Sequence, residues 1–456
     1  MSAANAELTV RVVRGIRYAR ARRFERPVLE SPGPDRLDAR APQPGVEGSE
    51  DCLHLTVWTP EGVTAVPVLV WIHGGAHVSG GVDDPVTDGS HLAATQGLVV
   101  VAVQYRLGAL GHLLGDGTEV GQDAANAALH DQLAALRWVR DHIATFGGDP
   151  SAVTLMGQSA GGVDVLAHLG ASTGEGLFHR VIAHSCTAER AMSLAHAARV
   201  RDAFLGAAGV GSVREAADLP VAALMAAQTR VIDRLSAAAP IDAIPFRPVI
   251  DGRLLPERPL EAIASGAGAD IPLLIGSARR EAVPWMAKGV AEEHALAAVL
   301  REVAPSASIA ELSAAYEIDR GRRSAQGELR EAVLSELMYR SPVDRVVGAR
   351  AAAHGAAATF VFDFDPAGLT GVDAGHSGEL PMVFGTSTAP AATELMSRMV
   401  DAWGSFARGG RPSSEASWCD ASEGVFRWGA HPQMIPASDP ALRAALAAAG
   451  AVCDRL

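Results

Sequence analysis

Six short apolar runs, rich in β-branched residues, most constrain what this chain can fold into. They are "VPVLVWIHG" (66–74), "LVVVAVQYR" (98–106), "VTLMG" (153–157), "RVIAHS" (180–185), "IPLLIGS" (271–277) and "ATFVFDFD" (358–365). Successive positions are apolar, rather than alternate ones, which is typical of strands covered on both faces. Segments with apolar residues at helical spacing separate these runs. One such segment spans about residues 126–146 and is ended by Gly147 and Gly148. The alternation predicts an α/β protein with a mostly parallel central sheet flanked by helices.

Two stretches rich in Ala and Leu, at about 188–240 and 285–353, interrupt this alternation. We expect them to be helical insertions packed over one end of the sheet. No linker, internal repeat or low-complexity tract divides the chain, so we expect a single domain over residues 1–456. Large α/β folds often reach this length as one domain.

Charge and composition exclude several classes of partner. The formal net charge is −13, which repels nucleic acid and anionic membrane surfaces. No stretch reaches the roughly 18 apolar residues that a spanning helix needs. Seven arginines lie within the first 26 residues, but no apolar segment follows them, so we interpret this region as structure and not as a targeting peptide. We expect a monomer or homodimer acting on small molecules.

The four cysteines indicate reduced thiols. They are widely spaced and form no C-x-x-C pair, which argues against a zinc site: Cys52, Cys186, Cys419 and Cys453. A long chain with so few cysteines is typical of a cytoplasmic protein without structural disulfides. We therefore predict a cytoplasmic location, no metal and no organic cofactor.

The stretch "VTLMGQSAGGVDVL" (153–166) predicts a catalytic nucleophile at Ser159. A strand that turns at once into a helix exposes the residue at the corner and leaves no room for side chains two positions before and after it. Gly157 and Gly161 occupy these two positions and have no side chain. The following helix directs its amide groups at the same point. A second match, "GASTG" (170–174), follows a helix instead of a strand, so we interpret Ser172 as a loop residue.

A partner motif, "WIHGGAHVSG" (71–80), ends another predicted strand. Its small residues let the backbone curl so that amides point at a developing oxyanion. The candidate donors are the amides of Gly75, Ala76 and Ala160. We expect His73, beside these glycines, to orient the backbone.

These motifs resemble those of the type B carboxylesterases, an α/β-hydrolase family that includes bacterial para-nitrobenzyl esterases and cholinesterases. The likeness extends over nearly the whole chain, in the family's order. It includes "RGIRYARARRFERP" (14–27), "SEDCLHLTVWTP" (49–60), "VVVAVQYRLGALGHL" (99–113), "DQLAALRWVRDHIATFGGDPSAVTLMGQSAGG" (131–162), "GLFHRVIAHS" (176–185), "FRPVIDGRLLP" (246–256) and "WGSFARGGRP" (403–412). The resemblance implies the α/β-hydrolase fold and hydrolysis of carboxylic esters by a Ser-Glu-His triad.

The same resemblance implies the acid and the base. "IPLLIGSARREAVPW" places Glu281 at the acid position, and "AGHSGELPMVFG" places His376 at the histidine position. Both follow predicted strands, and the order serine, acid, histidine is that of α/β-hydrolases. The competing interpretation of Glu281 is an exposed charge beside Arg279 and Arg280.

Departures from the family pattern concern the substrate pocket. Gln158 stands where the family leads one to expect Glu, which removes a negative charge and argues against choline-like substrates. His77 replaces the usual aromatic residue. The upstream cysteine that pairs with the Cys52 position in eukaryotic relatives is missing. Further candidates for the pocket wall are Trp285, Met286, Leu337 and Met338, for which core packing is an equal alternative.

We predict a serine carboxylesterase acting on short-chain or aryl esters through an acyl-enzyme. One alternative keeps the chemistry but makes the protein an amidase, a lactonase or an acyltransferase. A second is a catalytically silent binding protein on the same fold, although such proteins usually lose the nucleophile.

Overall fold

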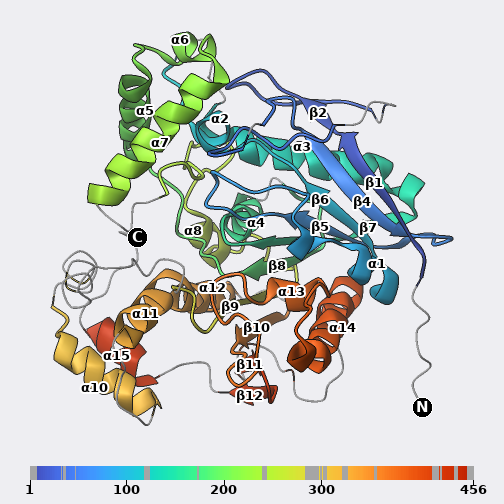
Figure 1. Ribbon diagram of the computed structural model, residues 1–456, viewed down its shortest axis with the longest axis vertical. Helices are drawn as coiled ribbons and strands as arrows, with labels where there is room; N and C mark the ends of the chain where they lie inside the picture. Colours follow the sequence, from blue (N-terminus) through green and yellow to red (C-terminus); the bar gives the residue numbers. More distant parts are fainter. Residues whose placement is uncertain are drawn as a thin grey trace.

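A computed structural model describes residues 8–448, apart from 32, 34–36, 47, 118–123, 172–173, 239–243, 283–296, 298–299, 301–305, 321–326, 354–356, 413–417, 419–420, 422–423 and 436–439. Its centre is one ten-stranded sheet, in the order β1-β4-β6-β5-β7-β8-β9-β10-β11-β12 (Figure 1). The pairs from β6 through β11 are parallel, while β1, β4 and β12 are antiparallel to their neighbours. The predicted mostly parallel sheet is confirmed.

All six predicted apolar runs form strands of this sheet. They are β5 (Val66–Ile72), β6 (Val99–Val103), β7 (Gly148–Gln158), β8 (Arg180–His184), β9 (Leu273–Ala278) and β10 (Thr359–Phe364). The other strands of the sheet are β1 (Val10–Arg17), β4 (His54–Pro60), β11 (Val425–Trp428) and β12 (Gln433–Ile435), and β2 (Ala19–Arg20) pairs with β3 (Val28–Leu29). The described part of the arginine-rich N-terminal region therefore contains strands β1 and β2, which agrees with its interpretation as structure.

Successive side chains of the central strands enter two different cores, which explains why the runs are apolar at every position. Along β5, Val68, Val70 and Ile72 belong to one cluster, which also contains residues of α3 (Ala127–His142), α4 (Ala160–Ala171), α8 (Pro259–Ala264) and α12 (Ser341–Ala352). Leu69 and Trp71 belong to the other, with residues of α1 (Ser90–Gln96), α13 (Leu380–Val383) and α14 (Thr393–Gly409). Helices thus cover both faces.

The two Ala- and Leu-rich stretches contain helices with small cores of their own. The first holds α5 (Leu194–Ala208), α6 (Val213–Ala217) and α7 (Val221–Ala238), which share a cluster with α2 (Gly108–His112). The second holds α10 (Ile309–Arg320), α11 (Glu328–Ser335), a π-helical turn (Glu336–Arg340) and α12, and α10 and α11 share a cluster with α15 (Pro440–Ala448). Figure 1 shows the two groups on the same side of the molecule, above and below. The single-domain organisation stays a prediction.

The strand order places a topological switch point beside β5. The chain runs from β5 to β6 on one side, and β7 then pairs with β5 on the other. In open α/β sheets, ligands bind outside the carboxyl ends of the strands at such a point. The predicted oxyanion loop follows β5 and Ser159 follows β7, so both motifs lie at this position.

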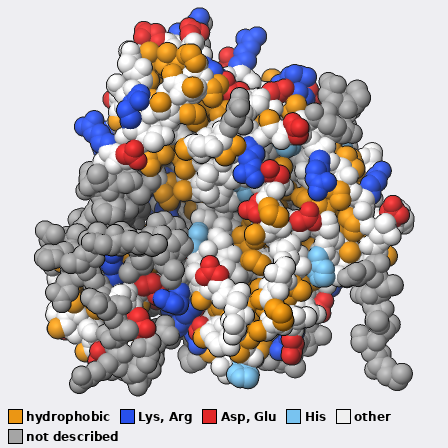
Figure 2. Space-filling model, in the orientation of Figure 1, with side chains coloured by type: hydrophobic (Ala, Val, Ile, Leu, Met, Phe, Trp, Pro, Cys, Tyr) orange, Lys and Arg blue, Asp and Glu red, His pale blue; other side chains and the backbone are white. Residues whose placement is uncertain are grey.

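The surface carries both signs of charge. Figure 2 shows acidic and basic side chains intermixed on the face in view, with apolar side chains gathered over the group formed by α5, α6 and α7. Among the described residues, no helix has the length and hydropathy to span a membrane.

Candidate active site

Ser159 occupies the corner between β7 and α4 in a strained backbone conformation. Its φ angle is +54°, which is rare for a residue with a side chain. Its amide donates to the carbonyl of His184 at 2.9 Å, and its carbonyl accepts from Val163 in the first turn of α4. This pair of hydrogen bonds holds the corner residue between β8 and the helix.

The neighbouring glycines are required by close backbone contacts. A Cβ atom at Gly157 would lie 2.4 Å from the carbonyl oxygen of Gly161, and one at Gly161 would lie 2.1 Å from that of Ile72. Real Cβ atoms do not approach so closely. The spacing of small residues around Ser159 therefore has the steric cause expected of a nucleophile elbow.

The oxyanion loop curls through three consecutive residues with positive φ angles, which are Gly75 at +108°, Ala76 at +54° and His77 at +59°. The Gly75 carbonyl accepts from the amides of Val78 and Ser79, both at 3.0 Å, which fixes the turn. Within the described part of the chain, the amides of Gly75 and Ala76 have no hydrogen-bond acceptor. They are available to a ligand oxygen.

His73 supports this loop from inside the protein. Its ring stacks on Tyr105 with centroids 4.5 Å apart, and the Tyr105 hydroxyl donates to the His73 carbonyl at 2.6 Å. Burial lowers the pKa of His73 to about 4, so the ring is neutral at physiological pH. Its contacts are with the backbone and with buried side chains, which agrees with an orienting role.

His77 lies in a buried chain of hydrogen bonds. Its Nε2–H donates to Asp164 on α4 at 2.8 Å, and Asp164 also accepts from Gln132 on α3 at 2.6 Å. The Oε1 atom of Gln132 accepts from His168 at 2.8 Å. All four side chains are buried. The prediction that His77 lines the substrate pocket gains no support from this placement, because its ring faces the interior.

The structure brings Glu281 and His376 together. Glu281 follows β9 and His376 lies on the loop that precedes α13, and the two segments meet where Arg280 pairs with Gly375. The Nδ1–H of His376 donates to Oε2 of Glu281 at 2.5 Å. The other carboxylate oxygen of Glu281 accepts from the Ala278 amide at 2.6 Å. Both contacts fix the carboxylate toward the imidazole.

The alternative for Glu281, an exposed charge beside Arg279 and Arg280, is wrong. The Glu281 side chain is fully buried. Arg280 instead pairs with Glu331 of α11 at 3.3 Å, and Arg279 lies 3.8 Å from Asp363 of β10. These acids are supplied by distant segments, so no pattern near Glu281 in the sequence predicted them.

Two further side chains contact His376. The Nε2 atom of Gln158 lies 3.1 Å from the Nε2 atom of the imidazole. The ring of Tyr339, on the π-helical turn, has its centroid 5.0 Å from that of His376. Burial raises the pKa of Tyr339. Sequence reasoning missed Tyr339, although π-helical turns frequently occur at functional sites.

His184 is a second residue that sequence reasoning missed. Its carbonyl accepts from the Ser159 amide, while its Nδ1–H donates to Glu379 at 3.0 Å. Its Nε2 accepts from the Trp403 indole at 2.8 Å. The whole group is buried. This arrangement anchors the end of β8, and with it the backbone on which Ser159 rests.

The remaining predicted pocket residues divide into two groups. Trp285, Met286 and the alternative serine, Ser172, lie outside the described residues. Leu337 is buried in the apolar cluster that joins α10, α11 and α15, and Met338 packs against it. Core packing therefore accounts for Leu337, and a role in the pocket stays a prediction for Trp285, Met286 and Met338.

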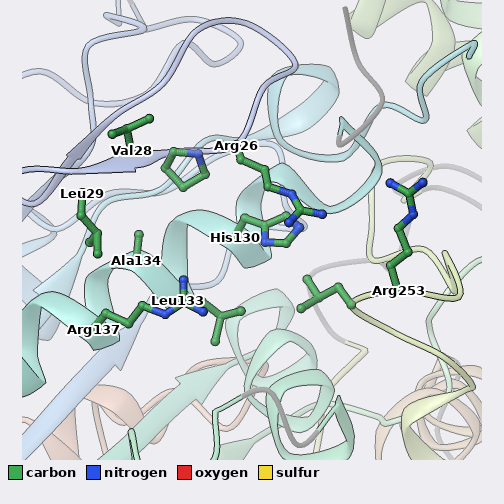
Figure 3. A pocket seen from close by; sticks show the side chains of 10 residues that line it. Arg26, Val28, Leu29, His130, Leu133, Ala134, Arg137 and Arg253 are labelled. Carbon is green, nitrogen blue, oxygen red and sulfur yellow. The ribbon is translucent and has the colours of Figure 1, made fainter. Parts of the chain in front are cut away.

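A basic pocket of about 600 Å³ lies elsewhere, against one face of α3 (Figure 3). It is lined by Arg26, Pro27, Val28, Leu29, His130, Leu133, Ala134, Arg137, Arg253 and Leu254. None of the candidate catalytic residues belongs to it. Among the described residues, no cluster of three side chains is suited to hold a metal ion.

A serine at a strand–helix corner, an adjacent loop of unpaired amides and a histidine bonded to a buried glutamate define the class of α/β-hydrolases that use a nucleophilic serine. The comparisons with known proteins agree. The chain belongs to the carboxylesterase family, whose model matches residues 1–434.

Individual relatives extend over most of the chain. It is 34% identical over 439 residues to the para-nitrobenzyl esterase of Bacillus subtilis (strain 168), covering 88% of this chain and 87% of that protein. It is 31% identical over 421 residues to carboxylesterase 1C of Rattus norvegicus, covering 85% and 75%. A solved PNB esterase structure superposes with a TM-score of 0.81 and 32% identity over 96% of both chains. The α/β-hydrolase fold is confirmed, and the protein is a serine hydrolase of carboxylic esters.

Proposed function

We propose that Ser159, His376 and Glu281 carry out ester hydrolysis in two steps. His376 Nε2 removes the Ser159 proton as the hydroxyl attacks the ester carbonyl, and then gives that proton to the departing alcohol. Water, deprotonated by the same imidazole, releases the acid from the acyl-enzyme. The observation that carries this proposal is the contact of 2.5 Å between Nδ1 of His376 and buried Glu281, since it leaves Nε2 as the basic nitrogen.

We assign the oxyanion hole to the amides of Gly75, Ala76 and Ala160. The first two lie on the loop of positive φ angles, and the third begins α4 directly after Ser159. Amides fixed by a rigid turn stabilise the charge of the tetrahedral intermediate without reorganising. The buried bond between His77 and Asp164 supports this assignment, because it joins the loop to the same helix.

We propose neutral aryl or short-chain esters as substrates. The name of the Bacillus relative states activity on a para-nitrobenzyl ester, and this chain aligns with 87% of that relative and has the fold of a solved PNB esterase. The neutral side chain of Gln158 beside His376 supports a preference for esters without a cationic group. We further propose a cytoplasmic location, which the buried and unpaired thiols of Cys52 and Cys186 support.

Labelling and kinetics together test the triad. An organophosphonate should modify Ser159, and Ser159→Ala should lower kcat for a p-nitrophenyl ester by about 10³-fold or more, as triad deletions do. Ser151→Ala is a matched control, because Ser151 is exposed near the start of the same strand, β7. It should retain wild-type turnover. Near wild-type activity of Ser159→Ala would overturn the assignment, and faster cleavage of an anilide than of its ester would point to an amidase.

A further inference from the structure

Gln158 contacts the nitrogen of His376 that must accept the serine proton. It is the last residue of β7, it is buried, and it immediately precedes Ser159. Its side-chain nitrogen lies 3.1 Å from Nε2 of His376. Glu281 occupies the opposite ring nitrogen. The imidazole is therefore held between a carboxylate on one side and a neutral amide on the other.

The tautomer of His376 decides which end of this amide faces the ring. The carboxylate of Glu281 accepts a hydrogen bond, so Nδ1 of the ring carries a proton. In the neutral ring Nε2 is then a bare acceptor, and only the NH₂ group of Gln158 can bond to it. The contact thus stabilises the unprotonated form of Nε2 in the resting enzyme, and the amide must release that lone pair before the Ser159 hydroxyl can donate its proton to it.

We propose that Gln158 is a positioning residue that keeps His376 in its neutral, base-competent form and so extends ester hydrolysis to lower pH. This inference rests on the proposed function of the triad. An imidazolium has a proton on Nε2, so protonation of the resting enzyme breaks the bond from the Gln158 NH₂ group and requires the amide to turn its oxygen toward the ring. A carboxylate at position 158 would act in the opposite sense, because it would accept from that proton and stabilise the imidazolium.

The other charged groups around His376 reach it from different directions. Glu281 bonds Nδ1, and the Tyr339 ring packs beside the imidazole with the Arg190 guanidinium 5.5 Å from the tyrosine centroid. Arg280 pairs with Glu331. On the histidine's own loop, Asp373 accepts from the Gly375 amide at 2.8 Å. Substitution at position 158 changes the group at Nε2 and leaves these contacts in place.

The test is the pH dependence of kcat/KM for a neutral p-nitrophenyl ester. Gln158→Glu should move the midpoint of the acid limb upward by about one pH unit or more, since an opposite charge near an ionising group typically has this effect. Gln158→Leu, which removes the donor without adding charge, should move it upward by a smaller amount. Gln433→Glu adds the same charge at an exposed residue of β12 and controls for net charge; its midpoint should match that of the wild type.

An acid-limb midpoint for Gln158→Glu within about 0.2 pH units of the wild type would overturn the inference, because a carboxylate bonded to Nε2 cannot leave the titration unchanged. If this variant does not fold, an unchanged midpoint for Gln158→Leu has the same meaning. Failure of the triad itself would be seen differently, as hydrolysis that persists in Ser159→Ala. Serine-dependent hydrolysis with unmoved profiles rejects only the role of Gln158.

Discussion

Gly161 sits where three backbone segments converge. A Cβ atom there would lie 2.1 Å from the carbonyl oxygen of Ile72 and 2.6 Å from that of His73. Both oxygens belong to the end of β5 and the start of the oxyanion loop, whose backbone cannot rotate away as a flexible side chain can. A side chain at position 161 would therefore displace both the nucleophile elbow and the start of the oxyanion loop.

We therefore expect Gly161→Ala to reduce kcat/KM by at least about tenfold and to destabilise the fold by about 1–3 kcal/mol, as overpacking does. Steady-state kinetics and urea unfolding measure the two effects. Gly206→Ala is the matched control, because a Cβ atom in that part of α5 meets nothing within 4 Å. It should be neutral or stabilising by up to about 1 kcal/mol. Wild-type activity in Gly161→Ala would contradict the steric account.

Prediction from sequence at the residue scale succeeded where local spacing carried the information. The positions of Ser159 and its glycines follow from one strand–turn–helix pattern. The environment of Glu281 could not be predicted in this way. Its neighbours Arg280 and Arg279 pair with Glu331 and Asp363, which lie 50 and 82 residues beyond Glu281 in the chain. Such pairing depends on how α11 and β10 pack, which no local pattern reports. The triad assignment itself stays a prediction until it is tested.

At the scale of elements, two buried histidines lie on helices near the oxyanion loop: His112 of α2 packs against the His77 ring, and His168 of α4 bonds Gln132 of α3. Burial lowers the pKa of His112 on α2 to about 3 and that of His168 on α4 to about 4. A histidine with a depressed pKa in the folded state binds fewer protons there than in the unfolded chain. Stability is therefore lost progressively as the pH falls below about 6.5, the ordinary pKa, toward the folded value.

His112→Leu should flatten this pH dependence. Its ring nitrogens have no hydrogen-bond partner among the described residues, so the substitution removes a titrating group without breaking such a bond. Between pH 6 and pH 4, the unfolding free energy of the wild type should fall by about 1.4 kcal/mol per pH unit more than that of the variant. Urea unfolding at several pH values measures the slope. Parallel pH profiles would show that His112 is not buried as a neutral ring.

The sequence predicted the elements themselves well, because a parallel sheet covered on both faces demands apolar residues at every strand position. It did not predict the polar connection between His77, Asp164, Gln132 and His168. Asp164 and His168 share one face of α4, one turn apart, yet that spacing alone is equally typical of a solvated helix face. Only the packing of α3 and the oxyanion loop against α4 makes these side chains partners.

At the scale of the whole molecule, the net charge of −13 sets the field that a substrate meets. Steering by this field falls with ionic strength, because salt screens exposed charges beyond about 10 Å at 0.1 M. We expect kcat/KM for a cationic ester to fall by about two- to tenfold between low and high salt, while that of a neutral isostere stays constant. Stopped-flow assays over a salt series measure this, and an equal response of both esters would rule out steering.

The carboxylate of Glu281 binds its own strand and the imidazole at once, through the Ala278 amide and His376. Ala278 is the last residue of β9, whose register with β10 holds it in place. Fraying of that strand end would take the anion away from the base while most of the sheet remained paired. Loss of turnover should therefore report local unfolding at this strand end. In aged samples, we expect ester hydrolysis to be lost while the circular dichroism spectrum remains native.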